Sequence, residues 1–169
     1  FQLQWYLDNK GQDSAILDEE SFNSYSTPKV GIDIGALTMW AKFADKREYN
    51  DVIVAVIDTG VDYNHSELKD AIWTNSQEIP NNNLDDDNNG YIDDVYGYNF
   101  CDDNGNVLSW NVDEAENQHG TQCAGIIVAK HDGAGIMGIA SQTNVKIMSL
   151  KVLNGDLDIN AGYVENIVK

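Results

Sequence analysis

The sequence predicts an α/β fold built on a doubly wound parallel sheet, and three segments carry this prediction. Residues 51–60 (DVIVAVIDTG) and 144–153 (NVKIMSLKVL) are short runs rich in apolar residues, as expected for strands buried on both faces. Residues 119–130 (HGTQCAGIIVAK) lie between them and have the length and composition of a helix. A strand, a helix and a strand in this order are typical of parallel sheets covered by helices.

The remaining segments complete the order of elements. Residues 21–30 (SFNSYSTPKV) predict a loop, and residues 34–45 (IGALTMWAKFAD) have helical spacing. Residues 74–118 are acidic with almost no periodicity, and residues 131–141 (HDGAGIMGIAS) predict a glycine-rich connection. Residues 159–169 (INAGYVENIVK) begin another helix in which the sequence stops, so we expect only the N-terminal portion of a domain. One side of the first helix is expected to consist of Leu37, Trp40, Ala41 and Ala44.

The composition limits the classes of partner. A chain of 169 residues with 42% hydrophobic residues is long enough for one domain with its own core. Its 28 acidic and 10 basic residues give a formal charge of −18, which argues against nucleic acid and suits calcium, basic peptides or simply solubility. No apolar run is long enough to span a membrane. No secretory leader is visible, so any leader is expected to have been removed.

An aspartate and a histidine mark the point where chemistry is expected. Asp58 ends the first predicted strand, and His119 begins the predicted helix. In open α/β sheets the functional crevice lies beyond the carboxyl ends of the strands, where these two side chains can meet. A carboxylate that accepts the Nδ1–H of an imidazole leaves Nε2 as a general base. Gly60 is expected to allow a sharp turn, and Gly120 to leave room beside the imidazole for substrate.

These residues stand in motifs that resemble those of the subtilisin-like serine proteases, the subtilases. VAVIDTGVDYNHSEL and HGTQCAGII resemble the family's Asp and His motifs, and the family's chain order is Asp, His, Ser. GAGIMGIAS followed by VKIMSLKVL is similar to the segment after the family's histidine helix, and QWYL is similar to the start of a mature catalytic domain. The sequence is similar to thermitase-like and proteinase K-like members, and this resemblance implies an N-terminal arm at residues 1–39 and a catalytic core at residues 40–169.

The sequence departs from the family in what it lacks. Subtilases carry their nucleophile in a Gly-Thr-Ser-x-Ala segment downstream of the histidine, with an oxyanion-hole Asn between the two, and neither is present. The resemblance therefore implies the charge-relay half of a serine endopeptidase, which is inert alone. The expected partners are a peptide or protein substrate and the rest of the same catalytic domain, as a second chain after cleavage near Lys169. Family habit, acidity and calcium use imply a secreted or cell-surface protein.

Two other classes of function remain open. A pseudoprotease that keeps the subtilase fold for binding or regulation also fits a chain without the serine motif. A calcium-dependent structural module explains the acidic loop but not the pairing of Asp58 with His119. A Gly-Thr-Ser-x-Ala segment after Lys169 would separate the protease from the pseudoprotease.

The two cysteines are expected to stay unpaired. Cys123 follows His119 by one helical turn and therefore lies on the same helix face. Subtilases similar to proteinase K and thermitase carry a free cysteine at this place. The resemblance thus implies a packing role for Cys123 and argues against a disulfide with Cys101.

Residues 83–100 (NLDDDNNGYIDDVYGYNF), here called the acidic loop, predict a calcium site. Oxygen ligands at alternate positions, followed by a glycine, are how a loop wraps Ca²⁺, and the segment reads D-x-D-x-N-G. The twelfth position is Tyr96 rather than Glu, so a nearer acid must close the site. The alternative is a solvated acidic loop without a metal. However, the four carboxylates among the candidate ligands lie within ten residues and repel one another without a cation. The candidate ligands are Asp85, Asp87, Asn89, Tyr91, Asp93 and Asp94.

Two weaker calcium candidates rest on resemblance. The segment NFCDDNGN resembles a calcium loop of thermitase-like subtilases through Asn99, Asp102 and Asn104. Glu67 stands at the position of a family acid that often ligates calcium.

Overall fold

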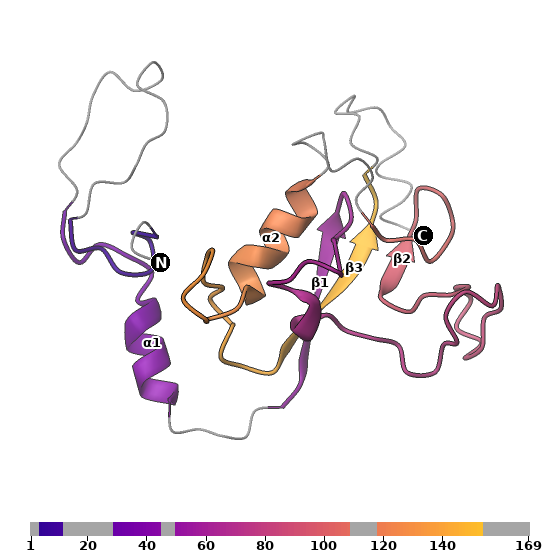
Figure 1. Cartoon of the computed structure of the whole chain (residues 1–169), viewed down its shortest axis with the longest axis horizontal. Helices are drawn as coiled ribbons and strands as arrows, with labels where there is room; N and C mark the ends of the chain where they lie inside the picture. The colour runs from indigo at the N-terminus through magenta and orange to yellow at the C-terminus, as the bar shows by residue number, and fades with distance from the viewer. Residues whose placement is uncertain (1–3, 12–28, 45–49, 109–117, 154–169) are drawn as a thin grey trace, which may run out of the picture.

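The computed structural model describes residues 4–11, 29–44, 50–108 and 118–153 of the chain. In chain order, its elements are α1 (Ala36–Phe43), β1 (Val52–Asp58), the short 3-10 helix η1 (Lys69–Ala71), β2 (Gly97–Asn99), α2 (His119–Val128) and β3 (Val145–Lys151) (Figure 1). Both predicted strands and both predicted helices within these ranges are confirmed. The helix expected over residues 159–169, and most of the loop expected over residues 21–30, lie outside the described residues.

The strands form one sheet in which each neighbouring pair is parallel. Their order is β1-β3-β2, so β3 is the central strand. β1 and β3 pair along their whole length, from Val52 opposite Val145 to Asp58 opposite Lys151. Because the strands are parallel, their carboxyl ends share one edge of the sheet, and Asp58 lies there. The arrangement confirms the α/β class with a parallel sheet.

The short strand β2 is an element that the sequence did not indicate. It lies inside the acidic segment and pairs with the last part of β3, with Gly97 opposite Ser149. Gly97 has a φ of 122°, and a Cβ there would lie 1.9 Å from the Ser149 carbonyl oxygen. Three residues give no readable alternation, so only the pairing with β3 reveals this strand.

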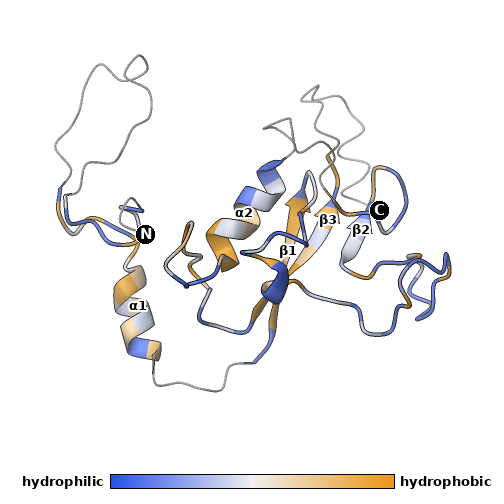
Figure 2. Cartoon of the chain, in the orientation of Figure 1, coloured by the Kyte–Doolittle hydropathy of each residue, from blue (hydrophilic) through white to orange (hydrophobic). Residues whose placement is uncertain are grey.

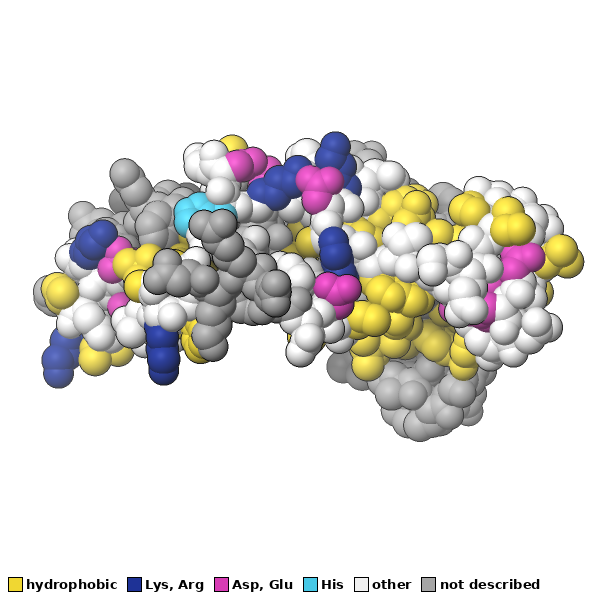
Figure 3. Space-filling model, turned by 90° about the horizontal axis from the view of Figure 1, so that it is seen from below, with side chains coloured by type: hydrophobic (Ala, Val, Ile, Leu, Met, Phe, Trp, Pro, Cys, Tyr) yellow, Lys and Arg dark blue, Asp and Glu magenta, His cyan; other side chains and the backbone are white. Residues whose placement is uncertain are grey.

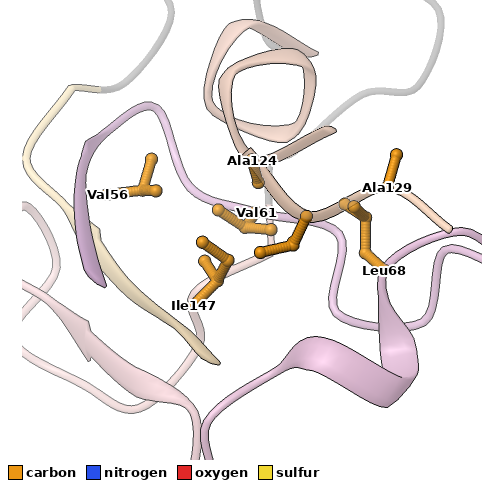
Figure 4. Close-up of a cluster of buried hydrophobic side chains, with 7 residues drawn as sticks. Val56, Val61, Leu68, Ala124, Ala129 and Ile147 are labelled. Carbon is orange, nitrogen blue, oxygen red and sulfur yellow. The ribbon is translucent and has the colours of Figure 1, made fainter. Parts of the chain in front are cut away.

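The main core lies between α2 and one face of the sheet (Figure 4). β1 is hydrophobic along most of its length, whereas α2 changes from hydrophilic at its start to hydrophobic at its end (Figure 2). The hydrophobic end of α2 packs into the core, and its hydrophilic start carries His119. The buried core residues are Val56, Val61, Leu68, Ala124, Val128, Ala129 and Ile147.

The expectation that β1 is buried on both faces is wrong for the described residues. Ile53 and Ile57 are 50% and 53% exposed, whereas Val56 is buried. β1 is an edge strand, and the described helix that packs on the sheet, α2, covers one face only. The opposite face of β1 therefore carries exposed apolar side chains.

The helix α1 is confirmed, but its buried side is not the expected one. Ala36 and Trp40 are buried, whereas Leu37, Ala41 and Ala44 are exposed. The indole Nε1 of Trp40 donates a hydrogen bond to the Ile139 carbonyl oxygen at 2.8 Å. This bond, together with a second small core, fixes the rotation of α1. That core consists of Leu7, Ala36, Trp40 and Met137.

The described helices are too short and too polar to cross a membrane.

Candidate active site and acidic cluster

Asp58 and His119 meet at the carboxyl edge of the sheet, although 61 residues separate them. His119 Nδ1 lies 2.7 Å from Asp58 Oδ2. The other carboxylate oxygen, Oδ1, accepts a hydrogen bond from the Thr59 N–H at 2.7 Å. Asp58 is only 9% exposed, whereas the imidazole of His119 is largely exposed. The carboxylate is thus held on both oxygens, and the Nε2 side of the ring faces outwards.

The turn after β1 is fastened to the start of α2 by two side-chain hydrogen bonds. The Gly120 N–H donates to Thr59 Oγ1 at 3.2 Å, and the Asp62 N–H donates to Thr121 Oγ1 at 3.0 Å. A Cβ at Gly120 would lie 2.3 Å from the Gly60 carbonyl oxygen and 3.1 Å from Asp58 Cβ. The expectation that Gly120 leaves room for substrate is therefore corrected, because this glycine admits the backbone of the turn instead. Gly60 has a φ of 102°, as its expected turn role requires.

The structure brings two carboxylates of the acidic loop together with that of Glu78, which precedes the loop, and the three are here called the acidic cluster. Glu78, Asp87 and Asp94 each place an oxygen within 4.8 Å of the others. Glu78 is 7% exposed, and its Oε1 accepts the backbone N–H groups of Asp86 and Asp87. Its Oε2 is buried and has no hydrogen-bond partner. A buried carboxylate oxygen without a donor is costly, and a cation bound between the three acids would remove that cost.

Amide groups lie against this cluster. The Asn75 Nδ2 donates to Asp87 Oδ2 at 2.9 Å and to Asp94 Oδ1 at 2.8 Å. The Asn89 Nδ2 donates to the other Asp94 oxygen at 3.0 Å. Among the described residues, the ion pairs do not include Glu78, Asp87 or Asp94. The amides thus offer N–H groups to the carboxylates, and the oxygens open to a hard cation such as Ca²⁺ are those of the three acids.

The other candidate ligands of the acidic loop have structural partners. Asp85 accepts the N–H groups of Asn89 and Gly90, and Asp93 accepts those of Asn82 and Asn83. The ring of Tyr91 lies against Tyr98, with 4.7 Å between centroids. These contacts shape the loop. A part for Asp85, Asp93 or Tyr91 in metal binding stays a prediction.

The second candidate loop is closed by its own side chains. Asn99 is fully buried; its Oδ1 accepts the N–H groups of Cys101 and Asp102, and its Nδ2 donates to Asp102 Oδ2. Asn104 Oδ1 accepts the Asn106 N–H at 2.9 Å. The role of Asn99, Asp102 and Asn104 as calcium ligands stays a prediction.

Glu67 borders a cavity of about 390 Å³ between η1, the end of α2 and the start of β3. Its Oε2 is buried without a hydrogen-bond partner, and so is the Oγ of Ser141, which lines the same cavity. Its carboxyl carbon lies 3.7 Å from the position of a Cβ on Gly135, in the connection after α2. Lys130 lines the same cavity, and the role of Glu67 as a calcium ligand stays a prediction.

Comparisons with known proteins decide the family. The model of the subtilase family, Peptidase S8, matches residues 49–167, which include β1, the acidic loop, α2 and β3. The chain belongs to the subtilase family.

Relatives of this subtilase chain include Subtilisin-like protease 1 of Plasmodium falciparum, 36% identical over 73% of the chain and 17% of the relative. The Major intracellular serine protease of Bacillus subtilis is 33% identical over 73% of the chain and 30% of the relative. The crystal structure of the Aeromonas sobria serine protease with its chaperone matches with a TM-score of 0.59 at 23% identity, over 99% of the chain and 21% of that protein. The chain thus spans less than a third of these relatives.

Cys123 of this subtilase chain lies under the histidine, as the spacing predicts. Its Sγ is 3.8 Å from His119 Nδ1 and 3.9 Å from Nε2, and neither Cys123 nor Cys101 forms a disulfide. Burial, and next the Asp58 carboxylate, raise the pKa of the Cys123 thiol. A protonated thiol is a poor nucleophile, which agrees with a packing role.

Sequence reasoning missed Glu78, a member of the acidic cluster, and Asn75, which donates hydrogen bonds to the other two members. Both precede the D-x-D-x-N-G pattern by several residues, so no loop motif includes them. The sequence feature that came nearest to indicating Glu78 is its place between two polar segments, and many surface acids have such a place. Only the folding of the loop back onto residues 75–78 reveals them.

Proposed function

We propose that this chain carries the acid–base half of a calcium-dependent subtilisin-like serine endopeptidase. The observation that carries the proposal is the 2.7 Å contact between His119 Nδ1 and a buried Asp58 carboxylate whose other oxygen is also bound. A carboxylate in this place fixes the imidazole tautomer and stabilises the imidazolium that forms during the reaction. Family membership supports the reaction type.

Each proton in the proposed reaction has a place to go. His119 Nε2 removes the proton from the hydroxyl of a nucleophilic serine as the serine oxygen attacks the peptide carbonyl carbon. The resulting imidazolium gives that proton to the leaving amine as the peptide C–N bond breaks, which leaves the acyl group on the serine oxygen. His119 Nε2 then takes a proton from a water molecule that attacks this ester, and returns it to the serine oxygen as the ester C–O bond breaks. Asp58 remains a carboxylate throughout and keeps the Nδ1–H in place.

The nucleophile is proposed to come from another segment. No serine of the sequence stands in the Gly-Thr-Ser-x-Ala context, and the relatives are several times longer than this chain. The proposed partner is the remainder of the same catalytic domain. The exposed apolar face of β1 supports a covering partner.

Calcium dependence is proposed from the acidic cluster. A bound Ca²⁺ would supply the positive charge that Glu78, Asp87 and Asp94 require. Asn75 holds Asp87 and Asp94 in place, and Asn89 also contacts Asp94. The unpartnered Oε2 of Glu78 supports this site most directly.

For the substrate and the cellular location, only a general class is proposed. A peptide or protein substrate follows from the proposed reaction. A secreted or cell-surface location is proposed from family habit, the acidic composition and calcium use, although one relative is named an intracellular protease.

The catalytic domain that contains this chain tests the proposal. We expect His119→Ala to lower kcat on a peptide substrate by about 10⁴- to 10⁶-fold, the scale known for subtilisin triads. Asp58→Asn should lower it by about 10⁴-fold, because it stabilises the wrong tautomer. Both variants should keep the melting temperature of the parent domain.

His65→Ala is the matched control, since His65 is exposed and lies seven residues after Asp58, outside the pair. Its kcat should equal that of the parent. Near-normal activity of His119→Ala would refute the assignment. A parent domain that neither cleaves peptides nor reacts with a serine-directed phosphonate would instead establish the pseudoprotease alternative.

A further inference from the structure

A pair of stacked tyrosines joins the acidic loop to the segment that follows Asp58. The rings of Tyr63 and Tyr96 are stacked, with 4.2 Å between centroids and 28° between planes. We propose that Tyr63 is a positioning residue that, through Tyr96, makes the geometry of the Asp58–His119 pair depend on cation binding at Glu78, Asp87 and Asp94. The inference rests on the proposed function and names the regulation of that site.

On the loop side, Tyr96 follows the acidic cluster almost directly. Asp94, two residues earlier, is one of its three acids. The backbone between them is held by Asn75, whose N–H donates to the Val95 carbonyl oxygen at 2.8 Å. The Tyr96 carbonyl oxygen accepts the Ser149 N–H of β3 at 3.0 Å. The position of the Tyr96 ring therefore depends on how Asp94 and Asn75 are held.

On the catalytic side, Tyr63 is part of the segment that follows Asp58 and contacts the start of α2. The adjacent Asp62 N–H donates to Thr121 Oγ1, two residues after His119. The start of the same turn is fastened to α2 through Thr59 and Gly120. A shift of the Tyr63 ring is therefore transmitted to a segment that binds the Asp58 carboxylate through the Thr59 N–H and binds α2 at Gly120 and Thr121, directly after His119.

The negative charge of the acidic cluster determines whether cation binding raises or lowers kcat. Without a cation, the three carboxylates repel one another, and the repulsion is stronger when they are buried than it is in water. That repulsion acts on Asp94, which is buried and two residues from Tyr96. A cation holds Asp94, and the stacked Tyr96 then holds Tyr63 and its turn. A general base misplaced by even a small distance loses kcat rather than substrate affinity.

A double-mutant cycle in the full catalytic domain tests the inference. Glu78→Gln removes the charge and the unpartnered oxygen but keeps an oxygen for the N–H groups of Asp86 and Asp87. At saturating calcium, we expect it to lower kcat by about tenfold in the parent and by less than about twofold in Tyr63→Ala, with KM little changed. Tyr63→Phe should retain the parent's response, because the stack needs the ring and not the hydroxyl.

Phe100→Ala is the matched control. It removes another aromatic contact of the acidic loop, with Tyr98 at 5.3 Å between centroids, and leaves the Tyr63–Tyr96 stack in place. The effect of Glu78→Gln on kcat should therefore persist in this background. Equal fold-changes in the parent and in Tyr63→Ala, or no effect of Glu78→Gln in the parent, would overturn the inference.

A second readout does not depend on activity. The proton between His119 Nδ1 and Asp58 Oδ2 gives a separate downfield resonance in the NMR spectrum. In a domain whose nucleophilic serine is replaced by alanine, calcium should shift this resonance when Tyr63 is present and leave it unchanged in Tyr63→Ala. An identical response in both proteins would overturn the inference. Loss of peptidase activity in every protein, the parent included, would refute the proposed function while this resonance still tests Tyr63.

Discussion

Asp58 shows how one side chain at the end of a strand can serve both the fold and the chemistry. Its two carboxylate oxygens are bound to different segments, one to the adjacent Thr59 N–H and one to His119 on α2. Its carbonyl oxygen also accepts the N–H groups of Val152 and Leu153, just after β3. A residue bound on so many sides has little freedom to move, so the imidazole meets a preorganised acceptor.

Cys123 provides a test of the packing interpretation at the same scale. We expect Cys123→Ala to leave kcat of the catalytic domain at the parent's level, because burial and Asp58 keep the thiol protonated near neutral pH. The measurement is kcat on a peptide substrate, with Cys101→Ala as the control. A loss as large as that of His119→Ala would show that the sulfur takes part in the chemistry.

The stability of the folded protein at alkaline pH is expected to depend on the protonation of Tyr98. Burial, followed by the hydrogen bond to Asp103 and nearby negative charges, raises the pKa of Tyr98 to about 12. An unfolded tyrosine titrates near about pH 10, so the stability that neutral Tyr98 contributes is complete below that pH and is lost as the pH rises towards 12. The melting temperature should therefore fall more steeply over this range in the parent than in Tyr98→Phe. Equal slopes would contradict this assignment.

At the scale of elements, the start of α2 lies in close contact with the turn after β1. Gly120 lies where a Cβ would meet both the Gly60 carbonyl oxygen and Asp58 Cβ. The closeness of the two elements lets a residue on α2 reach the carboxylate at the end of β1. Small residues at this crossing are therefore a requirement of the catalytic geometry.

Gly120→Ala tests this requirement. In a free helix the change is stabilising, but here we expect a loss of about 1–3 kcal/mol from overpacking. The measurement is the free energy of unfolding of the catalytic domain in denaturant. Gly125→Ala, in the same helix, is the control, because its nearest neighbour is the end of the flexible Ile136 side chain at 3.3 Å. A gain in stability for Gly120→Ala would contradict the geometry.

At the scale of the whole molecule, two features are unusual for a folded domain, namely exposed apolar side chains and buried carboxylates. Hydrophobic side chains gather on part of the face in Figure 3, among charged ones. The apolar residues of β1 that face away from α2 are among the exposed ones. The acidic cluster, in contrast, buries carboxylates without a cationic side chain among the ion pairs of the described residues.

Calcium should therefore stabilise the domain as a whole. Binding to the folded state alone contributes RT ln(1 + [L]/Kd), about 2.7 kcal/mol at a hundredfold excess over Kd. We expect a chelator to lower the melting temperature of the catalytic domain by several degrees, and Glu78→Gln or Asp87→Ala to reproduce part of that loss at saturating calcium. Magnesium should rescue poorly, because it requires a tighter octahedral geometry. Calorimetry measures this, and coincident curves with and without chelator would leave the loop a solvated acidic turn.

The sequence by itself determined the features that depend on local patterns. The apolar runs of β1 and β3 and the composition of α2 mark elements whose order allows a parallel sheet. In such a sheet the strand ends share one edge, so the meeting of Asp58 and His119 followed from chain order. The D-x-D-x-N-G pattern likewise located the acidic loop, because its oxygens and glycine are close in sequence.

Only the tertiary structure decided the features that depend on contacts between distant segments. Trp40 turns its side of α1 towards Ile139, and β2 exists because β3 lies beside it. Glu78 joins the acidic cluster because the loop folds back onto it, and Gly120 faces a backbone that no pattern in α2 reveals. Periodicity reports which side of an element is apolar, but the neighbour that covers that side is fixed by packing across the whole chain.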